Sequence, residues 1–166
     1  MADASALLGT WKMISWQRES VATGERADAL GPDPLGFINY GADGRMFAIV
    51  IQKDRDPPAG PVPTDDEKPR LFNSMLAYAG TYTLYDDRVV HHIDASWNQT
   101  WTGTDQVRFY KIDGDLLTIT GAPAKDPTTG QEVVYRIQFR KREPTFPAQT
   151  LEPAPNALAQ GHASAG

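Results

Sequence analysis

Cysteine is absent from this chain of 166 residues, which excludes disulfides, thiolate nucleophiles and cysteine-ligated metal sites. A chain without cysteine fits a reducing compartment, so we expect a cytoplasmic protein. The net charge is −5 and no cluster of lysine and arginine stands out, so neither nucleic acid nor an anionic membrane is an expected partner. No apolar run approaches the roughly 20 residues that a membrane-spanning helix needs, and residues 1–5 lack the features of a signal peptide.

Sequence motifs for several kinds of chemistry are also absent. Neither a glycine-rich phosphate loop nor a Gly-x-Ser-x-Gly nucleophile motif occurs in the sequence. The three histidines are His91, His92 and His162. Adjacent residues of a strand point to opposite faces of the sheet, so His91 and His92 cannot hold one metal ion together. We therefore expect neither a metal nor a cofactor.

Strand patterns dominate what is present. Short turns of aspartate and glycine, such as Gly41-Ala42-Asp43-Gly44, join apolar runs into successive hairpins. Sequential hairpins favour an all-β fold, an antiparallel up-and-down barrel of about eight strands. The expected strands are residues 10–19, 36–40, 45–52, 81–85, 88–97, 106–112, 116–120 and 133–141.

One segment interrupts this rhythm between the third and fourth expected strands. Residues 64–78 have a capping-box spacing at Thr64 and Glu67 and predict a helix. Its apolar face is formed by Leu71, Phe72, Met75 and Leu76. The helix either closes one end of the barrel or covers an edge, and the sequence leaves both open. Residues 1–143 are the expected barrel domain, and residues 144–166, rich in proline and alanine, predict a flexible tail.

The alternation of side chains along a strand predicts which residues face the interior. In residues 89–98, this rule places His91 among the apolar positions of the inner face and His92 toward water. If Trp11 faces inward, Met13 and Ser15 follow it, and Ile14 and Trp16 lie outside. For residues 106–112, the preference of apolar side chains for burial favours Val107 and Phe109 inside.

Several sequence blocks together resemble the lipocalin-like domain family of small bacterial and fungal proteins, over residues 7 to about 142. The first block contains Gly9-x-Trp11, where glycine lets the chain bend and tryptophan plugs the closed end of a barrel. The resemblance implies an antiparallel barrel around a cavity, and it implies that Gln106 and Arg108 point inward, contrary to the burial preference. The blocks are residues 8–12, 36–40, 42–46, 76–82, 91–92 and 103–108.

Two functions of different class follow from this interpretation. The first is binding of a small, largely apolar molecule, aromatic or polyketide-like, in the cavity. The second is a cofactor-free isomerase, cyclase or dehydratase in which His91 is the acid/base, Arg108 with Gln106 polarises a carbonyl, and Tyr40 or Tyr82 donates a proton. A catalyst requires His91 within reach of Arg108 or a tyrosine across the same cavity. The expected lining residues are Met13, Ser15, Tyr40, Met46, Tyr82, His91, Trp97, Gln106, Arg108 and Tyr135.

If Trp11 and Arg108 both face inward, the same alternation predicts an apolar outer surface. The seven apolar residues on this surface would form a larger patch than a soluble monomer usually exposes, and twofold dimers are the commonest way to cover such a patch. We therefore expect a homodimer built on residues 14–16, 47–51 and 107–109. The expected outer residues are Ile14, Trp16, Phe47, Ile49, Ile51, Val107 and Phe109.

Overall fold

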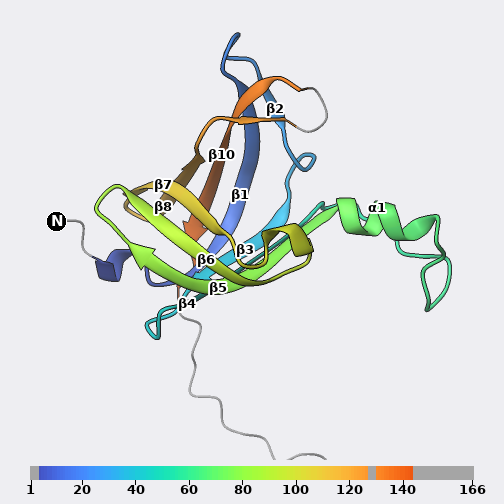
Figure 1. Cartoon of the computed structure of the whole chain (residues 1–166), viewed down its shortest axis with the longest axis horizontal. Helices are drawn as coiled ribbons and strands as arrows, with labels where there is room; N and C mark the ends of the chain where they lie inside the picture. Colours follow the sequence, from blue (N-terminus) through green and yellow to red (C-terminus); the bar gives the residue numbers. More distant parts are fainter. Residues whose placement is uncertain (1–3, 127–129, 144–166) are drawn as a thin grey trace, which may run out of the picture.

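A closed antiparallel barrel forms the body of the protein (Figure 1). The computed structural model describes residues 4–126 and 130–143, so the predicted tail at residues 144–166 lies outside the described residues. Pairing between β1 and β10 joins the two ends of the sheet, with Trp11 opposite Lys141. This closure confirms the predicted fold. The eight long strands are β1 (Gly9–Ser20), β3 (Leu35–Tyr40), β4 (Arg45–Ile51), β5 (Met75–Leu84), β6 (Arg88–Ser96), β7 (Asp105–Asp113), β8 (Leu116–Gly121) and β10 (Glu132–Lys141).

Short elements extend the barrel at its ends. Strand β2 (Arg26–Asp28) pairs with the end of β1, and β9 (Ala124–Lys125) pairs with the start of β10. These two additions lie at the same end of the molecule, at the top of Figure 1. Two single-turn 3-10 helices, η1 (Ala4–Ala6) and η2 (Gln99–Trp101), precede β1 and β7.

A β-bulge in β1 reverses the predicted faces of its second half. Met13 lies opposite Phe139, but Ser15 lies opposite Gln138, so Ile14 is an extra residue in the ladder. An extra residue shifts the alternation by one. Trp16 therefore points into the barrel, where it lines the cavity, and the predictions that Trp16 lies outside and Ser15 inside are wrong.

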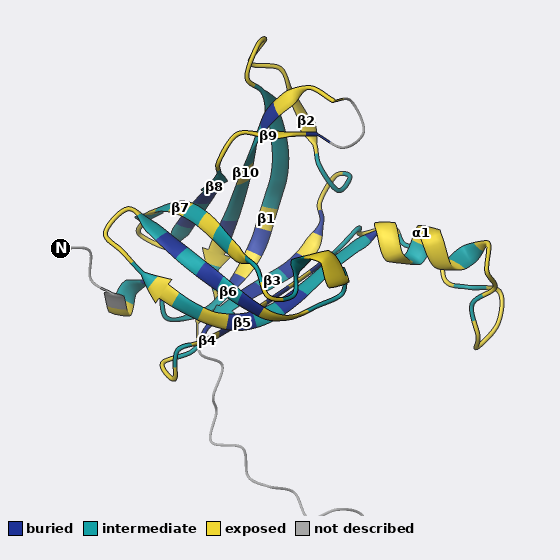
Figure 2. Ribbon diagram, in the orientation of Figure 1, coloured by how far each residue is buried: buried dark blue, intermediate teal, exposed yellow. Residues whose placement is uncertain are grey.

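Buried residues, dark blue in Figure 2, include a packed cluster at one end of the barrel, which we call the floor. The indole N–H of Trp11 donates to the Leu7 carbonyl oxygen over 2.8 Å, and the Lys141 ammonium lies 5.0 Å from the centre of its ring. The predicted burial of Trp11 is confirmed, since its side chain is 0% exposed. The floor residues, each at most 1% exposed, are Leu7, Trp11, Tyr40, Met46, Val89 and Leu117.

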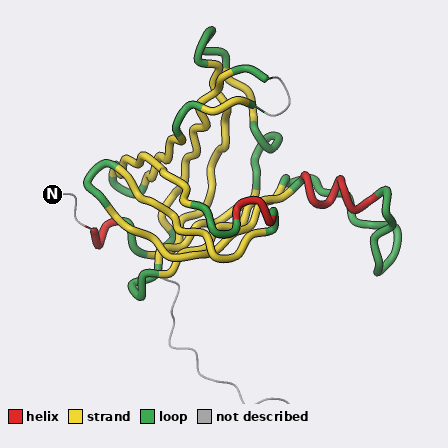
Figure 3. The backbone as a smooth tube through the Cα atoms, viewed as in Figure 1, coloured by secondary structure: helices red, strands yellow, loops and turns green. Residues whose placement is uncertain are grey.

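The helix is shorter than predicted. Helix α1 spans Glu67–Asn73, and Met75 to Tyr78 belong to strand β5. Pairing with β4, where Leu76 lies opposite Val50, decides this boundary, because tertiary strand pairing overrides local helical spacing. Figures 1 and 3 show that α1 projects away from the barrel. The helix as a whole therefore does not cover an edge of the sheet and does not close an end of the barrel.

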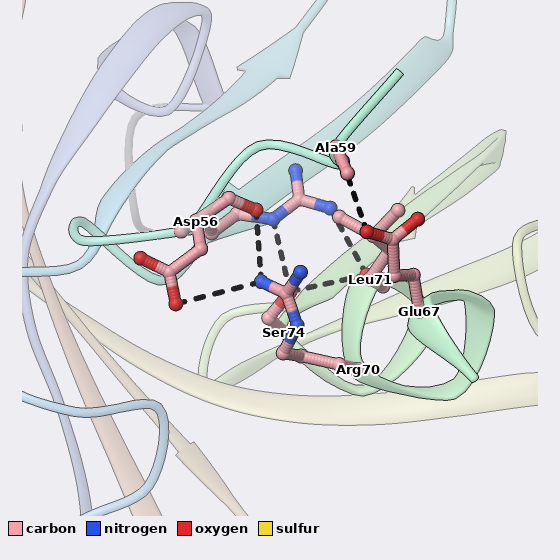
Figure 4. A network of polar contacts seen from close by, with 7 residues as sticks. Asp56, Ala59, Glu67, Arg70, Leu71 and Ser74 are labelled. Atoms are coloured by element: carbon pink, nitrogen blue, oxygen red, sulfur yellow. Dashed lines mark hydrogen bonds and ion pairs between the residues drawn. The ribbon is translucent and has the colours of Figure 1, made fainter. Parts of the chain in front are cut away.

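Hydrogen bonds hold α1 to the preceding loop (Figure 4). Arg70 donates to the backbone oxygen of Asp56 over 2.8 Å, and the Glu67 carboxylate accepts from the Ala59 N–H over 2.9 Å. Arg55 donates to Ser74 and to the Leu71 backbone oxygen, over 2.9 and 3.0 Å. This network fixes the segment that leads into β5, whose residues line the cavity mouth.

Candidate functional site: a cavity above the barrel floor

A cavity of about 480 Å³ occupies the half of the barrel above the floor. This volume is within the range of small-molecule sites, roughly 300–1,000 Å³. Most of its lining is apolar, and no aspartate or glutamate among the described residues contributes to it. The polar and ionisable members are Asn73, Tyr78, His91, Gln106, Arg108, Lys125 and Tyr135.

Aromatic side chains surround the outer part of this cavity. The ring centres of Trp97 and Trp101 lie 5.3 Å apart with an edge-on geometry, and Trp101 lies 5.7 Å from Tyr78. The Trp97 indole N–H donates to the backbone oxygen of Phe72 over 3.3 Å. The end of α1 is therefore connected to the aromatic group at the mouth. Such rings offer flat apolar area for a stacked ligand.

His91 lies between two tyrosines at the base of the cavity. Its Nε2 is 2.9 Å from the hydroxyl oxygen of Tyr40, and its Nδ1 is 3.0 Å from that of Tyr78. The imidazole is 0% exposed. Tyr40 approaches it from the floor, and Tyr78 lines the cavity beside it. Burial, with a smaller contribution from the charge of Arg108, lowers the pKa of His91 to about 3. The ring is therefore neutral at pH 7.

A glycine permits the close approach of β5 and β6 beside this histidine. The register of the two strands shifts between Ala79 and Gly80. A Cβ atom at Gly80 would overlap the carbonyl oxygen of His92, so only glycine fits without moving the backbone. Because Gly80 lies between Tyr78 and Tyr82 on the inner face, this close pairing sets the position of Tyr78 relative to β6.

Both tyrosine hydroxyls next to His91 retain their protons at neutral pH. Burial raises the pKa of Tyr40 well above its ordinary value. Burial also raises the pKa of Tyr78, although the nearby guanidinium of Arg108 acts in the opposite direction. Each hydroxyl therefore has one proton to donate and lone pairs to accept with.

Arg108 brings a positive charge to the cavity wall. It donates to the side-chain oxygen of Gln106 and to the Val107 backbone oxygen, both over 3.3 Å. No ion pair with a carboxylate forms at Arg108 within the described residues. Its outward neighbours Val107 and Phe109 are 39% and 42% exposed. The burial preference was wrong for this strand, and the inward direction implied by the family resemblance is correct.

The structure divides the predicted lining residues into two groups. Those at the cavity are Met13, His91, Trp97, Gln106, Arg108 and Tyr135. Four others lie elsewhere: Tyr40 and Met46 belong to the floor, Tyr82 donates to the Gly41 backbone oxygen over 2.9 Å, and Ser15 contacts Gln138. A part in ligand binding stays a prediction for each residue of the first group.

Sequence reasoning missed three prominent lining residues. Trp16 was placed outside because no sequence signal marks the bulge before it. Tyr78 was included in the predicted helix, although alternation backward from Tyr82 would have placed it on the inner face. Trp101 belongs to η2, which no pattern predicted.

Outside the cavity, His92 has the expected outward direction. Its ring nitrogens lie 2.7 Å from an Asp105 carboxylate oxygen and 2.8 Å from the Thr83 hydroxyl. Within residues 4–126 and 130–143, no group of three or more histidine, aspartate and glutamate side chains is arranged to hold a metal ion. Among the same residues, no helix has the length and apolar character needed to cross a membrane.

Comparison with known proteins places this barrel in a family. The model of a lipocalin-like domain matches residues 8–142. The chain belongs to the lipocalin-like domain family. A curated relative in Aspergillus oryzae (strain ATCC 42149 / RIB 40), named 4'-hydroxy-3'-methoxypropiophenone carrier protein ppsC, is 34% identical over 65 residues, which are 34% of this chain and 59% of that protein. The matched segment therefore spans little more than half of that relative.

A solved structure is similar to this member of the family over most of its length. It is the crystal structure of an uncharacterized protein from Bacteroides eggerthii DSM 20697. The two chains are 13% identical, with a TM-score of 0.41, over 82% of this chain and 99% of the other.

Proposed function

We propose that the protein binds and carries a small, largely apolar aromatic molecule in the barrel cavity. The observation that carries this proposal is the contrast between the filled floor and the hollow half above it. Floor residues such as Trp11 are fully buried, whereas the other half leaves about 480 Å³ between Trp16, Trp97 and Trp101. Protein interiors are normally packed without large voids, so a space of this size is most simply explained by an occupant.

The carrier relative supports the aromatic character of this ligand. Its name specifies an aryl ketone with hydroxyl and methoxy groups on the ring. A molecule of that kind combines a flat apolar body with few polar atoms. The lining offers the same combination, because aromatic rings form the mouth and the polar groups gather around Tyr78 and Arg108.

A second candidate is a cofactor-free isomerase, cyclase or dehydratase. One observation favours it: Tyr40, His91 and Tyr78 form a continuous hydrogen-bonded chain that ends beside Arg108. Against it, both ring nitrogens of His91 are occupied, and its low pKa makes the imidazole a weak base. We therefore favour the carrier function over catalysis. Conversion of a bound ligand to a product of different structure would favour catalysis instead.

The experiment for the carrier function uses the protein as purified. Native mass spectrometry of the intact protein is expected to show one small molecule per barrel, released on denaturation. Filling the cavity in Ala48→Phe should abolish this adduct, because Ala48 lines it. Ala95→Phe is the matched control, since Ala95 is exposed on β6. A wild-type protein that shows no adduct and binds no aromatic probe contradicts the proposal.

We also propose that the protein forms a homodimer through the outer face of β3, β4 and β5. Phe47 and Ile49 on β4 are 51% and 44% exposed, and Phe37 and Ala77 flank Ile49 on the neighbouring strands. The surface is smaller than the sequence predicted. Trp16 faces inward, and β5 and β6 separate β4 from the apolar residues of β7. A cytoplasmic location remains a prediction from the absence of cysteine.

A further inference from the structure

The positions of the protons around His91 determine which of these groups can donate a hydrogen bond to a ligand. A neutral imidazole has one N–H donor and one acceptor nitrogen. Tyr40 is buried, and among the described residues its hydroxyl has no hydrogen-bond partner except His91 Nε2. If Nε2 carried the proton, the Tyr40 O–H would be buried without an acceptor, which is costly. Tyr40 therefore donates to Nε2, and the proton of His91 is on Nδ1.

This arrangement leaves the Tyr78 proton free. The Nδ1–H of His91 donates to the Tyr78 hydroxyl oxygen, so the Tyr78 O–H does not point back at His91. Tyr78 lines the cavity. It is the most exposed of the three hydrogen-bonded residues, at 8%, whereas Tyr40 is 1% and His91 is 0% exposed. The chain therefore presents a donor to the cavity at Tyr78, while His91 orients it from behind.

Two further side chains that carry donors, Arg108 and Trp16, line the same cavity. Arg108 has hydrogen bonds to Gln106 and Val107 but no carboxylate partner within the described residues. The indole nitrogen of Trp16 is buried and has no hydrogen-bond partner among them. A half-buried cation without a carboxylate partner and a buried donor without an acceptor are unfavourable unless a ligand supplies the missing group.

We propose that the cavity binds its ligand through a phenol or enol oxygen held as the anion, with the Tyr78 hydroxyl donating to it and the Arg108 guanidinium neutralising it. This inference rests on the proposed carrier function. Binding of the neutral molecule then releases one proton to solvent, and the negative oxygen and Arg108 form an ion pair inside the barrel. The apolar body of the ligand extends toward Trp97 and Trp101 at the mouth.

The other ionisable groups of the lining are consistent with an anionic guest. His91 on β6 is neutral and donates toward Tyr78. Tyr135 on β10 keeps its proton, because burial raises its pKa. Lys125 on β9 is exposed and adds a second positive charge. The lining has no carboxylate among the described residues. The buried carboxylate of Asp126, which interacts with Tyr135, is paired with Arg18 over 2.9 Å.

The test compares 2-naphthol with naphthalene, two probes that differ by one oxygen atom. Calorimetric titration measures the affinity of each, and the absorbance of naphtholate measures ionisation of the bound probe. The wild-type protein should bind 2-naphthol more tightly than naphthalene. It should also show bound naphtholate at a pH where the free probe is still neutral.

Variants assign this preference to the two donors. Arg108→Gln should weaken 2-naphthol binding by about 10- to 100-fold and remove the naphtholate signal, since a charged hydrogen bond is lost. Tyr78→Phe should weaken it by about 3- to 10-fold. Naphthalene binding should be unchanged in both, which shows that the cavity is intact. Arg136→Gln is the matched control, because Arg136 is exposed on β10.

Two results overturn the inference in different ways. Equal affinities for the two probes, unchanged by Arg108→Gln and Tyr78→Phe, would reject the anion site while leaving the carrier function in place. Failure of the wild-type protein to bind either probe would reject the carrier function, and this inference with it.

Discussion

The hydroxyl oxygen of Tyr40 lies 2.9 Å from Nε2 of His91, and this contact determines the tautomer of the imidazole. We predict that His91 carries its proton on Nδ1 at neutral pH, because the Tyr40 O–H has no other acceptor among the described residues. Long-range nitrogen–proton NMR spectra of uniformly labelled protein measure this directly. The Nδ1 signal should have the shift of a protonated nitrogen, and Nε2 that of an acceptor.

Tyr40→Phe provides the control for this assignment. Without the Tyr40 hydroxyl, Nε2 loses its donor, and the fraction of the Nε2–H tautomer should rise. An Nε2–H tautomer in the wild-type protein would contradict this assignment. The Tyr78 hydroxyl would then donate to Nδ1 of His91 and not to a ligand.

The neutral His91 also predicts how stability depends on pH. Its pKa is about 3 in the folded protein and about 6.5 in an unfolded chain. Between these values the unfolded state binds more protons, so the free energy of unfolding falls as pH decreases, by up to about 1.4 kcal/mol per pH unit. Above pH 6.5 this contribution is complete. Urea denaturation at a series of pH values measures the slope.

A glutamine variant separates His91 from the other titrating groups. His91→Gln should reduce the slope between about pH 4 and 6.5, because glutamine offers a donor and an acceptor but does not titrate there. Equal slopes for the wild type and His91→Gln would show that His91 is not buried in its neutral form.

The barrel itself could be predicted from the sequence because its signals are local. Turns such as Gly41–Gly44 join strands that pair with their neighbours along the chain, and the Gly9-x-Trp11 opening places a large plug at the floor. Alternation alone sufficed for His91 and His92, because β6 is regular up to Ile93.

The candidate site was less predictable, because two of its features depend on tertiary pairing. The bulge at Ile14 arises from the pairing of β1 with β10, more than 100 residues apart, and it moves Trp16 into the cavity. The end of α1 at Asn73 depends on pairing between β4 and β5, and it moves Tyr78 from a helix to the inner face of a strand. The direction of Arg108 required the family resemblance, because Val107 and Phe109 are the more apolar set.

Trp11 is expected to contribute strongly to stability. Trp11→Ala removes the largest side chain of the floor and its hydrogen bond to Leu7, so the free energy of unfolding should fall by about 3–5 kcal/mol. Thermal or urea denaturation measures this loss. Trp97→Ala is the comparison, because Trp97 is only half-buried at the mouth, and it should affect probe binding more than stability. Similar stabilities for Trp11→Ala and the wild type would show that the floor is not the core of the barrel.

The homodimer is tested by sedimentation at micromolar concentration. The wild-type protein should sediment as two chains, and Phe47→Lys should sediment as one, because a charge is placed in the proposed interface. Phe109→Lys changes an exposed aromatic residue on the distant strand β7 and should remain dimeric. A monomeric wild-type protein would remove the dimer from this account without affecting the cavity.

The most direct test of the account is a crystal structure of the protein grown with 2-naphthol. We predict that the ring system lies above the floor between Trp16, Trp97 and Trp101, with its oxygen within hydrogen-bond distance of the Tyr78 hydroxyl and the Arg108 guanidinium. A cavity filled by side chains, or a probe bound only on the outer surface while the cavity contains no ligand, would contradict it.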